Sequence, residues 1–339
     1  MNEAIPMTRL GRSGLTVSRL ALGTMTFGDR TDEAEAQRIF SEAVDCGVNF
    51  IDTADSYAQG RSEEITGRLL AGRRDGFVLA TKLANPIGEG PNRRGLSRKW
   101  IVEELENSLQ RLGTDYVDIL YLHKEDPKTP LEETARAIAD LRRAGKLRYF
   151  GVSNFRAWRI ARLAELCARE GVDGPVVNQP LYHILNRTAE VEQFPACEAY
   201  GIGITVYSPT ARGILTGKYA PNTPPPSDSR GAGNKRMAET EYQPENIEAA
   251  AKVVAWANSR GMDPVPFAMA WVLANPLVSA AIAGPRTIEQ WRSYRAAFDC
   301  DIMPTDEAAI NALVKPGTTA IHQFSDPAYP PEGRPVVTA

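Results

Sequence analysis

Three ionisable side chains lie within or at the end of short apolar runs of this sequence. Asp52 lies in NFIDTA, Lys82 ends LATK, and His123 ends YVDILYLH. A carboxylate or an ammonium that is buried alone is strongly destabilised, because it loses its hydration and gains nothing in return. We therefore expect Asp52 and Lys82 to form a buried ion pair.

A phenol follows the carboxylate closely, because Tyr57 lies in the same segment, DTADSY. An ammonium beside a phenol favours the phenolate, so Lys82 is expected to lower the pKa of Tyr57 from about 10 toward the working range of a general acid. His123 can hydrogen-bond a carbonyl oxygen and orient it. Singly, such residues are more often a structural ion pair or a core histidine; together they favour proton transfer to a carbonyl.

Short β-branched and apolar runs alternate with helix-period segments along most of the chain, which is typical of repeated strand–helix units and a parallel sheet. The predicted strands span 19–25, 49–54, 77–82, 116–123, 148–154, 175–180, 204–208 and 278–284.

Two of the intervening helices have clear boundaries. Apolar residues at three- and four-residue spacing fill 36–44, between a potential cap at Asp32 and Gly47. The same spacing recurs over 97–112, from a capping-type serine to Gly113. Both stripes predict helices that pack one face on a core.

Eight strand–helix units favour a closed (β/α)8 TIM barrel. A doubly wound sheet would bind a dinucleotide through GxGxxG after its first strand, and the sequence has no such run. Residues 8–18 predict an N-terminal β-hairpin that plugs one end of the barrel. We expect one domain over 1–339, with a core at 18–298 and a tail at 299–339.

Polar residues follow the predicted strands at the end where a barrel of this kind carries its functional groups. The groups at strands two to eight are Asp52 to Tyr57, Lys82, His123, Ser153 and Asn154, Gln179, Tyr207, and Gly284 to Arg286. Such a concentration is not expected of a purely structural barrel.

Two segments interrupt the alternation of strands and helices. Residues 217–244 are rich in Pro, Gly, Asn and Ser, and 300–339 ends in PAYPPEGRP. Long irregular loops in a compact domain are either functional lids or disordered segments. The first follows the seventh strand, so it is expected on the catalytic face, as a lid over a cofactor or as a surface insertion.

Composition excludes several functions. The 339 residues, 43% of them hydrophobic, can bury a large core, and a net charge of −3 argues against a nucleic-acid or anionic-membrane partner. The basic run at 93–99 is expected to be a solvated loop.

Four widely spaced cysteines indicate neither zinc nor disulfides. Residues 1–8 do not have the pattern of a signal peptide, and the sequence has no run of about 18 apolar residues. We therefore expect a cytoplasmic protein that does not associate with a membrane.

The motifs together resemble the aldo-keto reductase family from about residue 10 to 297. They are FIDTADSYAQGRSEE, LATK, DYVDILYLH, GVSNF, NQPLYH, YSPTARGILTGKY and IAGPRTIEQ. The resemblance is greatest to the branch that contains potassium-channel β subunits and related bacterial oxidoreductases.

The resemblance implies that Asp52, Tyr57, Lys82 and His123 form a catalytic tetrad and that no metal is needed. It also implies a nicotinamide cofactor laid across the barrel mouth. Ser153, Asn154 and Gln179 would hold the carboxamide, and Tyr207 would stack on the ring. The remaining cofactor contacts would be Gly23, Thr24, Met25, Ser208, Gly213, Leu215, Lys218, Gly284, Arg286 and Gln290.

Arg286 would bind the adenosine 2′-phosphate, which favours NADPH over NADH. The chain departs from the family pattern after Gln290, so Arg292 or Tyr294 would meet the adenine. The expected activity is reduction of an aldehyde or ketone. Two alternatives remain: a nicotinamide-binding regulatory or partner-binding protein with slow turnover, and an enzyme that mainly oxidises alcohols with NAD. The expected pocket walls, at Met25, Phe27, 84–100, 124–125 and the tail, leave the substrate open, and the oligomeric state is open as well. Lys124 and Glu125 are expected to be rim charges that neutralise each other.

Overall fold

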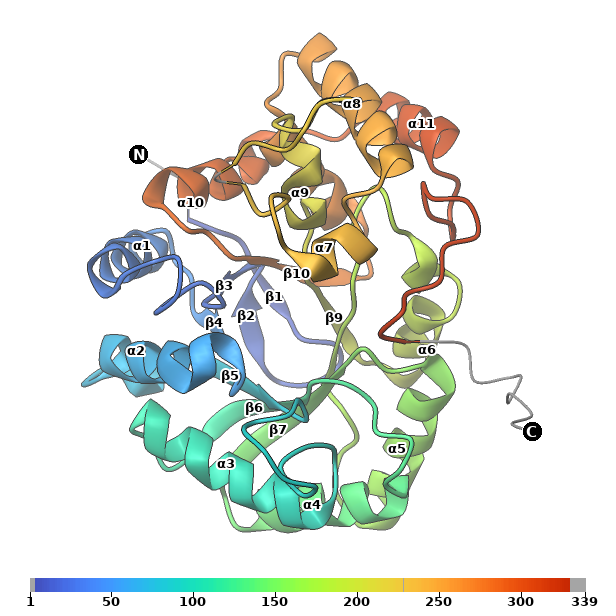
Figure 1. Ribbon diagram of the computed structural model, residues 1–339. Helices are drawn as coiled ribbons and strands as arrows, with labels where there is room; N and C mark the ends of the chain where they lie inside the picture. Colours follow the sequence, from blue (N-terminus) through green and yellow to red (C-terminus); the bar gives the residue numbers. More distant parts are fainter. Residues whose placement is uncertain (1–3, 228, 330–339) are drawn as a thin grey trace.

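Eight parallel strands close into a barrel in the computed structural model, which describes residues 4–227 and 229–329 (Figure 1). In barrel order the strands are β10 (Val278–Ala283), β3 (Leu20–Gly23), β4 (Phe50–Asp52), β5 (Val78–Leu83), β6 (Val117–Leu122), β7 (Leu147–Ser153), β8 (Val177–Gln179) and β9 (Gly203–Val206). All eight predicted strands are confirmed. Most are shorter than predicted, because the polar residues at their carboxyl ends leave the sheet.

Helices surround the barrel on its outside (Figure 1). They are α1 (Glu33–Asp45), α2 (Arg61–Leu70), α3 (Arg98–Leu112), α4 (Leu131–Arg143), α5 (Ala157–Arg169), α6 (Gln193–Tyr200), α7 (Lys235–Glu239), α8 (Pro244–Ser259), α9 (Pro264–Ala274), α10 (Ile288–Arg295) and α11 (Pro304–Leu313). The predicted caps are confirmed: Asp32 accepts from the backbone of Glu35, Ser97 caps α3, and Gly113 ends it in a left-handed conformation.

Alternation along each strand sends side chains in turn to the helices and to the barrel interior. In β3, Leu20 and Leu22 join the core beneath the helices, whereas Ala21 faces inward. Near the amino end the interior is filled by apolar side chains, Phe50 and Val78 among them. Toward the carboxyl end the inward positions of β4 and β5 become polar, which creates the floor of the site described below.

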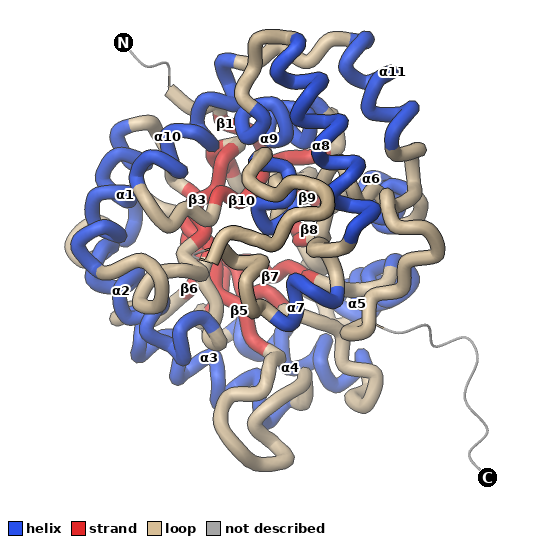
Figure 2. Tube along the Cα trace, turned by 45° about the horizontal axis from the view of Figure 1, so that its top comes forward, coloured by secondary structure: helices blue, strands red, loops and turns tan. Residues whose placement is uncertain are grey.

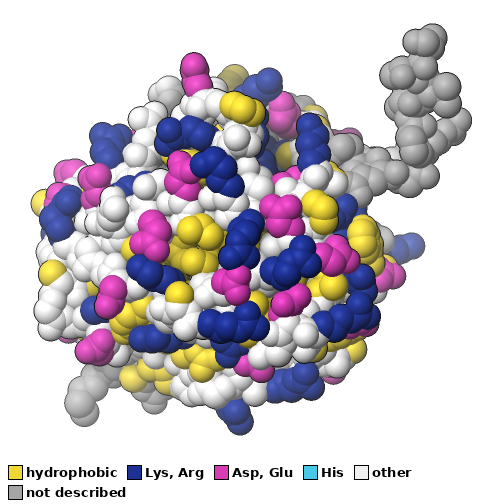
Figure 3. Space-filling model, turned by 90° about the horizontal axis from the view of Figure 1, so that it is seen from below, with side chains coloured by type: hydrophobic (Ala, Val, Ile, Leu, Met, Phe, Trp, Pro, Cys, Tyr) yellow, Lys and Arg dark blue, Asp and Glu magenta, His cyan; other side chains and the backbone are white. Residues whose placement is uncertain are grey.

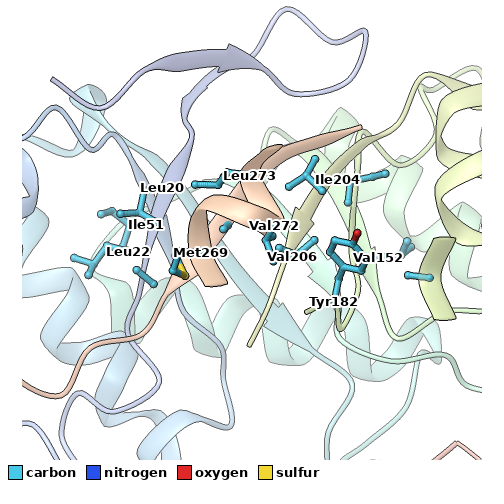
Figure 4. Close-up of a cluster of buried hydrophobic side chains, with 14 of the residues drawn as sticks. Leu20, Leu22, Ile51, Val152, Tyr182, Ile204, Val206, Met269, Val272 and Leu273 are labelled. Carbon is cyan, nitrogen blue, oxygen red and sulfur yellow. The ribbon is translucent and has the colours of Figure 1, made fainter. Parts of the chain in front are cut away.

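The larger core lies between the strands and the surrounding helices. Helix α9 is buried along most of its length, and its Met269, Val272 and Leu273 lie among outward side chains of neighbouring strands (Figure 4). Tyr182, after β8, stacks on Trp271 with ring centroids 5.5 Å apart. This packing holds the strand ends in a rigid frame.

The predicted N-terminal hairpin is present as β1 (Met7–Arg9) paired antiparallel with β2 (Thr16–Ser18). Its Leu10 and Val17 are fully buried and belong to the apolar cluster inside the barrel. The backbone of Gly11 packs directly on Gly201 and Gly203, where an added Cβ would lie within 2.6 Å of backbone atoms. The hairpin therefore closes the amino end of the barrel.

The two segments predicted as irregular contain helices. The first holds α7, and 300–339, predicted as a structureless tail, contains α11, so that prediction was wrong. Helix α11 begins at Pro304 and has a capping box closed by Asp306, which also pairs with Arg260, the residue that follows α8. This partner lies far away in sequence, and the helix is too short for a clear apolar stripe. The end of PAYPPEGRP lies outside the described residues.

The segment between β9 and α8 lies over the carboxyl end of the barrel, as Figures 1 and 2 both show. The C-terminal segment reaches the same region, where Asp326 pairs with Arg236 of α7. The face predicted to carry the catalytic groups is therefore covered by two segments that are distant in sequence.

Basic and acidic side chains alternate over the face drawn in Figure 3, with isolated apolar side chains between them. None of the helices in the described part of the chain is long and apolar enough to cross a lipid bilayer.

We predict that Leu10→Ala lowers the free energy of unfolding by about 2–4 kcal/mol, because it opens a cavity inside the barrel. Urea denaturation followed by circular dichroism measures this. Met7→Ala on β1 is the control, since Met7 is 49% exposed and should cost little. Equal effects of the two substitutions would show that the hairpin does not plug the barrel.

Candidate functional site

A cavity of about 610 Å³ opens at the carboxyl end of the barrel. Most of the predicted site residues line it: Gly23, Met25, Asp52, Tyr57, His123, Ser153, Asn154, Gln179, Tyr207, Ser208, Gly213, Lys218, Gly284, Arg286 and Gln290. They come from seven of the eight strand ends and from the segment after β9, so the fold brings together residues that are dispersed in sequence. Lys82, near the end of β5, is fully buried and does not line the cavity.

The predicted ion pair between Asp52 and Lys82 is present and fully buried. Parallel pairing sets Asp52 of β4 opposite Ala80 of β5, and Lys82 is the next residue of β5 on the same inward side. Lys82 Nζ also donates to the carbonyl of Thr53 at 2.8 Å, and Gln179 Nε2 donates to Asp52 Oδ2 at 2.8 Å. Burial alone would lower the pKa of Lys82. The effects of Asp52 and Tyr57 together outweigh burial and raise this pKa above its ordinary value, so the ammonium stays charged.

Tyr57 lies at the start of a tight turn, Tyr57–Gly60, and its Oη is 3.3 Å from Lys82 Nζ. The pKa of Tyr57 is shifted in the opposite direction to the shift predicted from the sequence. Burial raises the pKa of Tyr57 above its ordinary value, and the opposing effect of Lys82 is smaller. Asp52, which neutralises the ammonium, raises it as well. The phenol is therefore protonated at neutral pH, which is the state that a proton donor needs.

His123 lies beside Tyr57, with ring centroids 6.0 Å apart and an edge-to-face angle of 81°. Its backbone N–H donates to the carbonyl of Leu83, and its carbonyl accepts from Asn154 Nδ2. Burial, Lys82 and Lys124 all lower the pKa of His123, well below 6.5. The imidazole is thus neutral at neutral pH and can donate one hydrogen bond.

The residues predicted to hold a carboxamide form one network. Ser153 Oγ donates to the carbonyl of Gln179 at 2.7 Å, and Tyr207 Oη donates to Asn154 Oδ1 at 2.8 Å. Gln179 connects this network to Asp52. A substitution among the predicted carboxamide residues would therefore disturb the Asp52–Lys82 pair, and a substitution in the pair would disturb those residues.

Several residues predicted for the site do not line the cavity. Thr24 is buried and directs its hydroxyl to Ser62, and Leu215 lies in the hydrophobic core. Phe27, predicted as a pocket wall, is fully buried. In each case a loop position was assigned to the mouth although its side chain turns into the scaffold. Only a backbone contact to a ligand remains open to Thr24 and Leu215.

The two residues proposed for the adenine separate in the fold. Tyr294 lines the cavity, whereas Arg292 is exposed and forms a bidentate pair with Glu42. The expectation that Lys124 and Glu125 neutralise each other was wrong, because Glu125 is buried and pairs with Arg156 and Arg159 at the start of α5.

A group of basic side chains lies at one end of the cavity. Lys218 and Arg286 were predicted there, and the structure adds Arg30 and Arg230. Within the described residues none of these four pairs with a carboxylate. Burial and then the charges of Arg212, Arg30 and Arg286 lower the pKa of Arg230. This end of the cavity therefore attracts anions.

Other lining residues were not predicted as individual site residues. Ser56 and Asn85 lie near the tetrad, and Ala328 and Tyr329 come from the C-terminal segment. Asn85 follows Lys82 closely, so its place after the third strand was a usable signal. Tyr329 had none, because only tertiary packing returns the chain end to the barrel mouth.

Residues with left-handed backbone gather at this face of the barrel. Non-glycine residues with positive φ in or beside the lining segments are Ala58, Gln59, Ala84, Asn154, Ser208, Ala211 and Arg212. Such conformations are costly and persist where the surrounding structure holds them, which is common at functional sites.

The model of the Aldo/keto reductase family matches residues 19–315. The chain belongs to this family. The sequence resemblance is thereby confirmed, and the match extends past residue 297 to include α11.

Among known proteins, this aldo/keto reductase is 40% identical to a probable voltage-gated potassium channel subunit beta of Oryza sativa subsp. japonica, over 90% of this chain and 95% of that protein. It is 40% identical to the uncharacterized oxidoreductase YrpG of Bacillus subtilis, over 87% and 91%. It is 34% identical to L-glyceraldehyde 3-phosphate reductase of Escherichia coli K12, over 88% and 89%. Family and relatives support an oxidoreductase acting in carbonyl reduction.

Two buried histidines make the stability of this aldo/keto reductase depend on pH. Burial is the first cause that lowers the pKa of both His123 and His183, the latter to about 4. The unfolded chain, with histidine pKa values near 6.5, therefore binds more protons than the native state, and stability falls as pH drops below about 6.5.

We predict that His183→Gln weakens this dependence by on the order of 2 kcal/mol between pH 7 and pH 5. Urea denaturation at several pH values measures the change. The control is His322→Gln, which removes an exposed histidine. An unchanged slope in the His183 variant would show that His183 is not buried in its neutral form.

Proposed function

We propose that this aldo/keto reductase reduces an aldehyde or ketone to the alcohol with NADPH, and that Tyr57 supplies the proton. The carrying observation is the buried Lys82 ammonium, held by Asp52 and placed 3.3 Å from the phenol oxygen of Tyr57 at the cavity floor.

The cavity fits a dinucleotide phosphate. It connects the tetrad to the basic group of Arg30, Lys218, Arg230 and Arg286, which has no carboxylate partner among the described residues. Four such positive charges match a ligand that carries a pyrophosphate and a further 2′-phosphate. Arg230 supports this fit, because an anion would relieve the repulsion from the neighbouring arginines. When bound, the reduced nicotinamide would supply the hydride.

Each residue of the proposed tetrad then has a different role. Tyr57 holds its proton at neutral pH because the phenol is buried, and it can pass that proton to the developing alkoxide. Lys82 favours the resulting phenolate through its charge, and Asp52 keeps Lys82 in place. His123, neutral, donates a hydrogen bond to the same oxygen and orients the carbonyl.

Gln179, Ser153 and Asn154 would hold the carboxamide of the nicotinamide, and Tyr207 would lie against its ring. The contacts among these residues support a preorganised surface at this point. The substrate would be a small carbonyl compound. We also propose a cytoplasmic protein, since all four cysteines are free thiols.

One alternative function has a specific observation in its favour. The 40% identity to a protein named as a potassium channel subunit suggests a nicotinamide-binding regulatory protein with slow turnover. Absorbance at 340 nm with a panel of aldehydes separates the two possibilities, because a reductase consumes NADPH in many cycles whereas a slow binding protein does not.

We predict that Tyr57→Phe lowers kcat about 10²- to 10⁴-fold, because it removes the proton donor while keeping the ring. NADPH binding, followed by fluorescence titration, should change little. Tyr116→Phe is the control, since Tyr116 lies at the start of β6 and is absent from the cavity wall. Turnover of the Tyr57 variant near the wild-type rate would refute the assignment.

We predict that Arg286→Ala raises the KM for NADPH at least about tenfold more than the KM for NADH, because a guanidinium–phosphate contact contributes roughly 1.5–3 kcal/mol. Steady-state kinetics with both cofactors measures this. Arg292→Ala is the matched control, because its guanidinium binds Glu42 outside the cavity. Equal effects of Arg286→Ala on both cofactors would remove the 2′-phosphate role.

A further inference from the structure

Asn85 lies next to the only histidine of the tetrad and has no role in the function proposed above. It is the second residue after β5. The residue between them, Ala84, has a φ of 133° and turns the chain at the barrel rim. The carbonyl of Ala84 accepts from the backbone of Gly95, which closes the base of the connecting segment. Asn85 is half-buried, and its side chain lines the cavity.

The contact that matters joins Asn85 Nδ2 to His123 Nδ1 at 3.1 Å. An amide nitrogen can only donate, so Nδ1 must accept, and the single proton of the neutral imidazole must then lie on Nε2. Asn85 Nδ2 also approaches Ser56 Oγ, at 3.5 Å, and a hydroxyl oxygen can accept from the same amide group. Both contacts are satisfied when the amide nitrogen of Asn85 faces His123.

The tautomer decides whether His123 can act. A carbonyl oxygen is an acceptor, so the ring nitrogen that faces it must carry the proton. In the other tautomer Nδ1 would hold the proton, and Nε2 could only accept. The backbone contacts of His123 with Leu83 and Asn154 fix its position but do not select a tautomer. Among the described residues, Asn85 is the side chain that bonds to Nδ1.

We propose that Asn85 is a positioning residue that holds His123 in the Nε2-protonated tautomer and thereby enables it to donate to the substrate carbonyl. The catalytic part of this inference rests on the proposed function; the tautomer itself does not. Lys82, Lys124 and Tyr57 are the charged or titratable groups nearest the ring, and the lysines disfavour a second proton on it.

Nuclear magnetic resonance of the full chain labelled with ¹⁵N-histidine tests the tautomer directly. Two-bond correlations distinguish a protonated ring nitrogen from an unprotonated one, and the chain has only three histidines. His183 is an internal reference, because its Nδ1 accepts from the backbone of Leu185 at 3.2 Å, which also selects the Nε2 proton. His183→Gln and His322→Gln assign the signals.

We expect wild-type His123 to be protonated on Nε2 alone at pH 7. Asn85→Asp replaces the donor by an isosteric acceptor, so His123 Nδ1 should become protonated. Asn85→Leu should give a mixture of tautomers. The control is Asn92→Leu, an exposed residue of the same connecting segment, which should leave the signals of His123 unchanged.

Kinetics give the second readout. Asn85→Leu and Asn85→Asp should lower kcat about 10- to 100-fold, with KM for the carbonyl substrate changed much less. A wild-type His123 protonated on Nδ1, or an unaltered tautomer in Asn85→Asp, would overturn the proposal. A raised KM with unchanged kcat and unchanged His123 signals would overturn it in favour of a substrate contact. Failure of the proposed reductase activity would leave the spectra interpretable, so the two failures are distinguishable.

Discussion

The buried ion pair of Asp52 and Lys82 is the constraint on which the rest of the site depends. Neither charge could be kept at the barrel floor alone, since an isolated buried charge is strongly destabilised. Paired, they place a fixed positive charge next to the phenol of Tyr57. Gln179 and the carbonyl of Thr53 satisfy the remaining hydrogen-bonding capacity of the pair. The pair is thus both an element of the fold and the electrostatic centre of the proposed chemistry.

The barrel provides this arrangement through register and alternation. Neighbouring parallel strands bring inward-facing residues of β4 and β5 together at the same height. Apolar inward side chains and the hairpin close the amino end, so the polar groups can face solvent and ligands only at the other end. The same geometry gathers residues of the remaining strand ends around the pair.

The two ends of the cavity differ in net charge. At the floor it is balanced, because the ammonium has its carboxylate. Toward the other end lie arginines that have no carboxylate partner among the described residues, and their mutual repulsion makes that end favourable for anions. Neutral His123 and Tyr57 lie between a stabilised cation and the substrate side, where burial keeps the imidazole deprotonated and the phenol protonated. Burial therefore sets the protonation states that the proposed chemistry requires.

The sequence by itself indicated the family through its motifs, and it indicated the eight strands and the hairpin through local periodicity and turn residues. It also indicated the pairing of Asp52 with Lys82, since burial leaves each charge no other choice. Tertiary structure alone decided the rest. The pKa of Tyr57 rises rather than falls, because desolvation depends on everything packed around the phenol.

Other outcomes were equally inaccessible to local patterns. Glu125 pairs with arginines at the start of α5 instead of Lys124, Leu215 turns into the core, and Tyr329 returns from the chain end to the cavity. Each depends on the direction of a side chain or on the meeting of distant segments. Spacing along the chain carries no information on either, whereas the folded backbone fixes both.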